Sequence, residues 1–273
     1  MKKFMFTSIT LLAALFTIIA CSDDDDNNEV FYSNPKTFVL VHGAFQAPYA
    51  WQFTKADLES RGQKVVVVEL PGHGSDNADP ATLSINAYRD KVVSAINAIS
   101  GQVILVGHSM GGMVVTAVAE EIPEKIEKLV FVGAFVPANG QSIVDLASTD
   151  SEALFGPALI PSADQLTFNM AQENLAPVFL ADGSSAVKQL LITNYKAEPS
   201  IPFTNPATIT AGKFGSVNKY YIFTEQDKAI SLSNQHAMAA AAGITKNYSM
   251  NTSHCPFLSK PSEFTALLMT IIQ

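Results

Sequence analysis

The sequence predicts an α/β fold in which a mostly parallel sheet of about six strands is flanked by helices. Short, continuously apolar segments alternate along the chain with longer segments in which apolar residues recur at helical spacing. The apolar segments are continuous rather than alternating, which is typical of strands buried on both faces of a parallel sheet. Because 48% of the 273 residues are hydrophobic and only 15% are charged, the chain can also bury a large core.

The first strand and helix are followed by clear stop signals. Residues 38–41 form a short apolar run, which predicts a strand. Residues 49–60 are compatible with a helix, and Gly62 suits its C-terminal end because glycine readily adopts the left-handed conformation. Residues 64–70 predict the second strand, which the Pro71-Gly72-His73-Gly74 turn ends.

The next elements continue the same alternation. Apolar residues recur at helical spacing over 85–99, and Ser84 suits the N-cap position of that helix. Residues 102–106 predict a strand, 113–122 a helix and 128–132 another strand. Successive strands joined by helices are parallel neighbours in a covered sheet.

This regular order stops near residue 138 and returns near residue 212. The intervening residues contain scattered Pro, Ser and Asn with short helix-like pieces, such as 187–192. We therefore predict an insertion over 138–212 that caps the sheet, since irregular segments of this length are often functional. The regular elements that follow it are a strand at 220–223, a helix at 232–242, a strand at 246–250 and a helix at 261–272.

The N-terminal residues 1–20 predict a lipoprotein signal peptide. Lys2 and Lys3 precede an apolar run that ends in Ile18-Ile19-Ala20-Cys21, which resembles a bacterial lipobox. We expect Cys21 to carry the lipid that anchors the chain to a membrane. The alternative is an ordinary signal peptide with an incidental cysteine. Residues 21–33 are acidic and predict an extended tether to a folded domain over 34–273.

The expected location of the chain is the bacterial cell envelope. The acidic run after Cys21 resembles sorting signals of surface-exposed lipoproteins, and Ser22 fits sorting to the outer membrane. The net charge is −8 and no Lys/Arg cluster follows the N-terminal pair, which argues against a nucleic-acid partner. Cys21 and Cys255 are the only cysteines, so lipidation of Cys21 would leave no pair for an intrachain disulfide.

The segment Gly107-His108-Ser109-Met110-Gly111 lies between a predicted strand and a predicted helix. Such a sharp turn holds the serine hydroxyl out at the tip of the sheet, in a strained backbone that neighbouring glycines permit. The N–H of Met110 would also lie at a helix N-terminus, where negative charge is favoured. Ser109 is therefore the candidate nucleophile.

A serine hydroxyl needs a base, and the base needs an acid that orients it. His254 is the only histidine in a loop after the last strand, and the order nucleophile, acid, histidine is typical of this kind of turn. The acid should end a strand between Ser109 and His254. Asp227 follows the strand at 220–223 and fits this position, with Glu225 as the local alternative.

The oxyanion that forms when a serine attacks a carbonyl needs two donors directed at it. The N–H of Met110 is one candidate. The other should lie in the loop after the first strand, where we choose the N–H of Ala44 and keep Phe45 as the alternative. This chemistry implies neither a metal nor an organic cofactor.

Several motifs together resemble the α/β-hydrolase fold, in the branch of plant methylesterases, hydroxynitrile lyases and their bacterial relatives. The resemblance runs from about Phe38 to Ile271. It rests on Phe38-Val-Leu-Val-His-Gly-Ala44, on Gly107-His-Ser-Met-Gly-Gly112, on the segment from Phe214 to Ile230, and on His254 followed by Leu258-Ser-Lys-Pro261. The resemblance implies an Asp227 acid and oxyanion donors at Ala44 and Met110.

Two positions argue against a lyase within that branch. The lyases carry a threonine where this chain has Gly43, and a lysine where it has Cys255. The resemblance therefore implies a serine carboxylesterase that acts on a small-molecule ester. Hydrolysis of thioesters, lactones or carbon–carbon bonds on the same residues is the alternative. A surface binding protein that keeps these residues without turnover is a third hypothesis.

Overall fold

Six parallel strands form the central sheet of the structure, a computed structural model that describes residues 35–273. The predicted signal peptide, the lipidation site Cys21 and the acidic tether lie outside the described residues. The strands, in their order across the sheet, are β2 (Lys64–Val68), β1 (Thr37–Val41), β3 (Val103–His108), β4 (Ile126–Val132), β8 (Lys219–Thr224) and β9 (Lys246–Met250). Every pairing in this sheet is parallel, as predicted.

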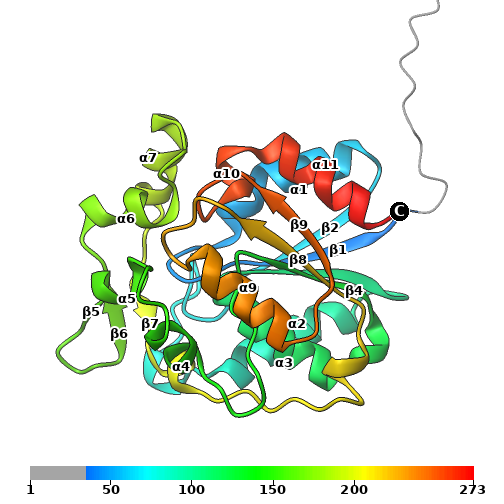
Figure 1. Cartoon of the computed structure of the whole chain (residues 1–273), viewed down its shortest axis with the longest axis horizontal. Helices are drawn as coiled ribbons and strands as arrows, with labels where there is room; N and C mark the ends of the chain where they lie inside the picture. The colour runs from blue at the N-terminus through cyan, green and yellow to red at the C-terminus, as the bar shows by residue number, and fades with distance from the viewer. Residues whose placement is uncertain (1–34) are drawn as a thin grey trace, which may run out of the picture. The chain divides into compact units, whose positions relative to one another are not determined.

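Helices cover both faces of this sheet (Figure 1). On one face, α1 packs against α11, with α10 beside them; on the other, α2 packs against α3, with α9 nearby. The bounds are α1 (Gln52–Ser60), α10 (Pro256–Ser259), α11 (Pro261–Ile271), α2 (Ile85–Asn97), α3 (Gly111–Glu121) and α9 (Leu232–Ala241). Because both faces are covered, β1, β3 and β4 are almost entirely buried, which explains their continuous apolar sequences.

The predicted terminal signals of two helices are confirmed. Ser84 Oγ accepts a hydrogen bond from the Ala87 N–H at 3.1 Å and so caps α2. Gly62 has a φ of 76° and follows the end of α1. These local signals set where α2 begins and where α1 ends.

The segment between β4 and β8 contains short helices and a small antiparallel sheet. Figure 1 shows its elements beside the carboxyl ends of the central strands, on the left of the view. We call residues 138–212 the cap segment. The elements are α4 (Ile143–Ser148), α5 (Phe155–Ala158), β5 (Ile160–Pro161), β6 (Thr167–Asn169), α6 (Gln172–Phe179), α7 (Ser185–Thr193), β7 (Glu198–Pro199) and α8 (Ile201–Thr204). Its strands, two or three residues long, were not predicted.

Buried aromatic side chains join the cap segment to the core. Phe45, from the loop after β1, contacts the rings of Phe155 and Phe179 and stacks on Tyr195, with centroids 5.6 Å apart and planes 11° apart. Aromatic pairs of this kind stabilise a fold beyond simple burial. Among residues 35–273, no helix is long and apolar enough to cross a bilayer.

Candidate active site

Ser109 lies in the turn between β3 and α3, with a φ of 55°. This left-handed conformation is unfavourable for a residue with a side chain, so the surrounding structure must impose it. The Ser109 N–H donates to the carbonyl of Val132 at 3.3 Å, and its carbonyl accepts from the N–H groups of Gly112 and Phe135 at 2.9 and 3.1 Å. The neighbouring strand β4 and the start of α3 therefore hold the turn.

Glycine at position 43 lets the loop after β1 approach this turn closely. A Cβ at Gly43 would lie 2.7 Å from Ser109 Cβ and 2.8 Å from His108 Nδ1, closer than real side chains approach. The loop that carries Ala44 consequently runs directly beside Ser109. A threonine at position 43 would not fit here without a shift of this backbone.

The structure brings Asp227 and His254 into direct contact. Asp227 follows β8, His254 follows β9, and both side chains are fully buried. The Nδ1 of His254 donates to Asp227 Oδ2 at 2.7 Å, because a carboxylate only accepts. This bond places the proton of a neutral ring on Nδ1 and leaves the lone pair on Nε2, which is the form a base requires.

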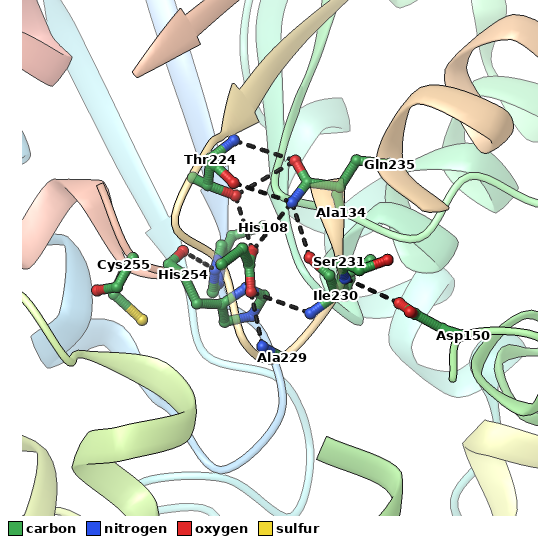
Figure 2. A network of polar contacts seen from close by, with 12 residues as sticks. His108, Ala134, Asp150, Thr224, Ala229, Ile230, Ser231, Gln235, His254 and Cys255 are labelled. Atoms are coloured by element: carbon green, nitrogen blue, oxygen red, sulfur yellow. Dashed lines mark hydrogen bonds and ion pairs between the residues drawn. The ribbon is translucent and has the colours of Figure 1, made fainter. Parts of the chain in front are cut away.

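Other donors surround the Asp227 carboxylate. Oδ1 accepts the N–H groups of Ala229 and Ile230 at 2.7 and 3.0 Å. Oδ2 accepts the hydroxyl of Thr224 at 2.7 Å and the amide of Gln235 at 3.2 Å, as part of the network in Figure 2. Both oxygens of the buried carboxylate therefore have hydrogen-bond partners, as a buried polar group requires. Thr224 and Gln235 were not predicted as site residues, although Thr224 ends β8, the strand that precedes Asp227.

His108, the residue before Ser109, contacts His254 with its ring. Its ring centroid lies 4.4 Å from that of His254, and its Nε2 donates to the His254 carbonyl at 3.0 Å. Burial lowers the pKa of His108 well below its usual value, so this ring is neutral. The Nε2 of His254 is buried without a hydrogen-bond partner among the described residues, so its bond to Ser109 Oγ is not formed in this arrangement. Such bonds often tighten only when substrate binds.

The oxyanion candidates differ in whether their N–H groups are occupied. The Phe45 N–H donates to Glu198 Oε2 at 2.7 Å, so this alternative is already engaged. The N–H groups of Ala44 and Met110 donate no hydrogen bond within residues 35–273. The geometry thus favours Ala44 over Phe45.

The alternative acid Glu225 and the thiol of Cys255 occupy different environments. Glu225 is exposed, whereas Asp227 is buried at the histidine, so the structure favours Asp227 as the partner. Cys255 is fully buried, and the Gln46 amide donates to its sulfur at 3.0 Å. Burial raises the pKa of the Cys255 thiol well above its usual value, which keeps it protonated and unreactive.

The cap segment also contacts the loops that carry these residues. The ring of Phe179 lies 5.7 Å from that of His254, with an interplanar angle of 41°. Asp150 Oδ2 accepts the Ser231 N–H at 2.8 Å, just after the Asp227 loop, as Figure 2 shows. Ser253, the residue before His254, donates its hydroxyl to Asp182. The environment of His254 is therefore partly built by the cap segment.

A model of the alpha/beta hydrolase family matches residues 38–267 of this chain. The chain belongs to this family. The chain is 30% identical over 250 residues to a protein of Arabidopsis thaliana named putative methylesterase 11, chloroplastic. That match covers 86% of this chain and 63% of the relative, so the chain spans less than two thirds of the relative's length.

Solved structures share the fold of this chain. Polyneuridine aldehyde esterase has a TM-score of 0.79 at 23% identity, over 88% of this chain and all of that one. An extracellular alpha/beta-hydrolase from a Paenibacillus species has a TM-score of 0.74 at 25% identity, over 86% of this chain and 98% of that one. The chain is thus similar in sequence to a protein named a putative methylesterase, and in fold to an esterase and to another α/β-hydrolase.

Proposed function

We propose that this hydrolase is a serine carboxylesterase whose catalytic residues are Ser109, His254 and Asp227. One observation carries the proposal: His254 is held by the buried Asp227 through Nδ1, while its Nε2 is buried without a partner beside the Ser109 turn. A base in this state is ready to accept a proton from the serine hydroxyl.

In the first half of the proposed reaction, Ser109 Oγ attacks the ester carbonyl carbon. His254 Nε2 takes the hydroxyl proton as the new C–O bond forms, and Asp227 stabilises the resulting imidazolium. The N–H groups of Ala44 and Met110 donate to the oxyanion. The bond to the alcohol oxygen then breaks, and that oxygen takes the proton from Nε2, which leaves an acyl group on Ser109.

Water completes the cycle by the same route. His254 Nε2 takes a proton from water as the water oxygen attacks the acyl carbon. The second tetrahedral oxyanion meets the same two donors. When it collapses, Ser109 Oγ departs with the proton from Nε2, and the carboxylic acid is released.

The aromatic surroundings support a small or aromatic ester as the substrate. Phe179 lies against His254, and Phe155 and Phe203 stack behind it with centroids 6.2 Å apart. Apolar and aromatic side chains favour an apolar acyl or alcohol group. The similarity to a methylesterase-like relative adds methyl esters to the candidates.

A panel of esters tests this proposal. The panel includes p-nitrophenyl acetate, longer p-nitrophenyl esters and methyl esters of aromatic acids, with a thioester, a lactone and a β-diketone alongside. We expect turnover of the esters by the wild type and none by Ser109→Ala. Cleavage of the diketone or thioester with no ester turnover would assign another reaction to the same residues. No turnover of any compound, with Ser109 unreactive to a fluorophosphonate, would favour a binding protein.

We also propose that Cys21 carries the lipid anchor and that the protein belongs to the outer membrane of a bacterial envelope. The lipobox-like sequence that ends at Cys21 supports this proposal. Labelling cells with an alkyne analogue of palmitate should mark the wild type and Cys255→Ala but not Cys21→Ala. After membrane fractionation, only Cys21→Ala should be found in the soluble fraction. Labelling of Cys21→Ala would contradict the proposal.

A further inference from the structure

A buried ion pair connects the cap segment to the turn after β2. His73 Nε2 lies 3.0 Å from Glu198 Oε2, and the two side chains are 2% and 0% exposed. The other ring nitrogen, Nδ1, lies 3.0 Å from the carbonyl of Pro71. Because a carbonyl oxygen and a carboxylate only accept, both nitrogens of His73 must donate, which makes the ring an imidazolium.

The same carboxylate contacts the oxyanion loop. Glu198 Oε2 accepts the Phe45 N–H at 2.7 Å, and Phe45 is the residue next to Ala44. Phe45 has a φ of 60°, a conformation that a large side chain adopts only when its surroundings impose it. A charge-assisted hydrogen bond to its N–H is one such constraint, and the stacking of its ring on Tyr195 is another.

Backbone hydrogen bonds of the small sheet hold Glu198 in position. It lies in β7, where it pairs with Phe168 of β6 in the small sheet of the cap segment. The next residue but one, Ser200, donates its N–H to Leu166 and its hydroxyl to Gln165 at 3.0 and 2.6 Å. The backbone around Glu198 is therefore fixed, and this fixes where its buried carboxylate lies.

Stability alone does not account for this pair. A buried ion pair often stabilises a protein no better than apolar side chains of similar size. This one lies at the point where the cap segment meets the loop that carries an oxyanion donor. Its Phe45 contact constrains the backbone on one side of Ala44, while the close approach of Gly43 to Ser109 constrains it on the other.

We propose that Glu198 is a positioning residue that, paired with His73, holds the Phe45 N–H and thereby directs the Ala44 N–H toward the reacting carbonyl oxygen. The inference rests on the proposed esterase function. In this arrangement the cap segment contributes to the oxyanion site. Glu198 acts through its hydrogen bond to the Phe45 N–H and not by contact with the substrate or Ser109.

Three variants separate positioning from a structural role. Glu198→Ala removes the acceptor for the Phe45 N–H. Glu198→Gln keeps an acceptor oxygen there, and its amide can donate to a neutral His73. The double variant His73→Leu with Glu198→Met replaces the ion pair by apolar side chains but leaves the Phe45 N–H without its acceptor. Asp164→Asn is the matched control, since Asp164 is an exposed carboxylate of the cap segment that bonds only within its own loop.

The readouts are kcat and KM for p-nitrophenyl acetate, the melting temperature, and amide hydrogen exchange of a peptide containing Phe45. Glu198→Ala should lower kcat about 10- to 100-fold with little change in KM, because a misdirected oxyanion donor weakens only the transition state. Glu198→Gln should keep kcat within about threefold of wild type. The double variant should fold and still show the low kcat.

Two results would overturn the inference: a folded double variant with wild-type kcat, or a Glu198→Gln variant whose kcat falls as far as that of Glu198→Ala. If Glu198→Ala does not fold, the other two variants decide. Hydrogen exchange needs no substrate: the Phe45 amide should exchange faster in the double variant and at the wild-type rate in Glu198→Gln. A wild type that turns over no ester would therefore count against the proposed function alone.

Discussion

Asp227 Oδ2 accepts the Nδ1 proton of His254 at 2.7 Å, with both side chains fully buried. The contact joins the loops after β8 and β9, which are neighbouring strands of the central sheet. In open α/β sheets, ligands bind at the carboxyl ends of the strands, where these loops meet. The fold thus creates the Asp–His contact, and the remaining residues of the proposed site converge on the same edge.

Replacing Asp227 by Asn should greatly reduce turnover. An amide can donate to Nδ1 and so favour the ring form that carries its proton on Nε2, which cannot act as base. We expect kcat to fall by about 10⁴-fold. Steady-state kinetics with p-nitrophenyl acetate measures this, with Glu225→Gln as the matched control because Glu225 is the exposed acid two residues away. Equal losses in the two variants would contradict the role of Asp227.

Adding a methyl group at Gly43 should impair the reaction. The new Cβ would lie 2.7 Å from Ser109 Cβ, so the loop that carries Ala44 must move away. A displacement of about 1 Å in a catalytic group can cost about 10²-fold in rate, so we expect Gly43→Ala to lower kcat by roughly that factor. Gly156→Ala is the control, because a Cβ there meets nothing within 4 Å. Wild-type kcat in Gly43→Ala would refute this account of the loop.

The stability of the wild type should decrease at alkaline pH through His73. Burial alone would lower the pKa of His73, but the charge and hydrogen bond of Glu198 outweigh it and raise the pKa, against a smaller opposing effect of Lys196. The rings of His42 and Tyr88 also face His73. His42 stays neutral, because burial and then the charge on His73 lower its pKa to about 3.

Because the pKa of His73 is raised in the folded state, the protein should lose stability as the pH rises. The stabilisation is fully present below the pKa of His73 in the unfolded chain, near 6.5, and is lost as the pH rises through the higher folded value. Urea unfolding from about pH 6 to about pH 10 should show the loss in wild type and a smaller loss in Glu198→Gln. Equal slopes for the two proteins would show that the pair does not titrate as described.

Candidate site residues that follow regular strands could be predicted from the sequence, whereas those in the cap segment could not. Ser109 and Asp227 each follow an apolar strand, and His254 follows the more polar strand β9. The strand pattern indicates where the chain turns at the edge of the sheet. Glu198 lies in a strand of two residues, too short for any period to show, and its partner His73 lies in a Pro-Gly turn. Glu198 is recognised as a buried charge only from its contact with His73, which lies 125 residues away in the sequence.

A rapid-quench experiment can show directly whether Ser109 forms an acyl-enzyme. Wild-type protein is mixed with p-nitrophenyl acetate, quenched in acid during the first turnover and digested for mass spectrometry. We expect one added acetyl group on the peptide that contains Ser109, absent in Ser109→Ala and reduced in His254→Ala. Ester turnover with no acetyl group on that peptide, or with the group on another residue, would contradict this expectation.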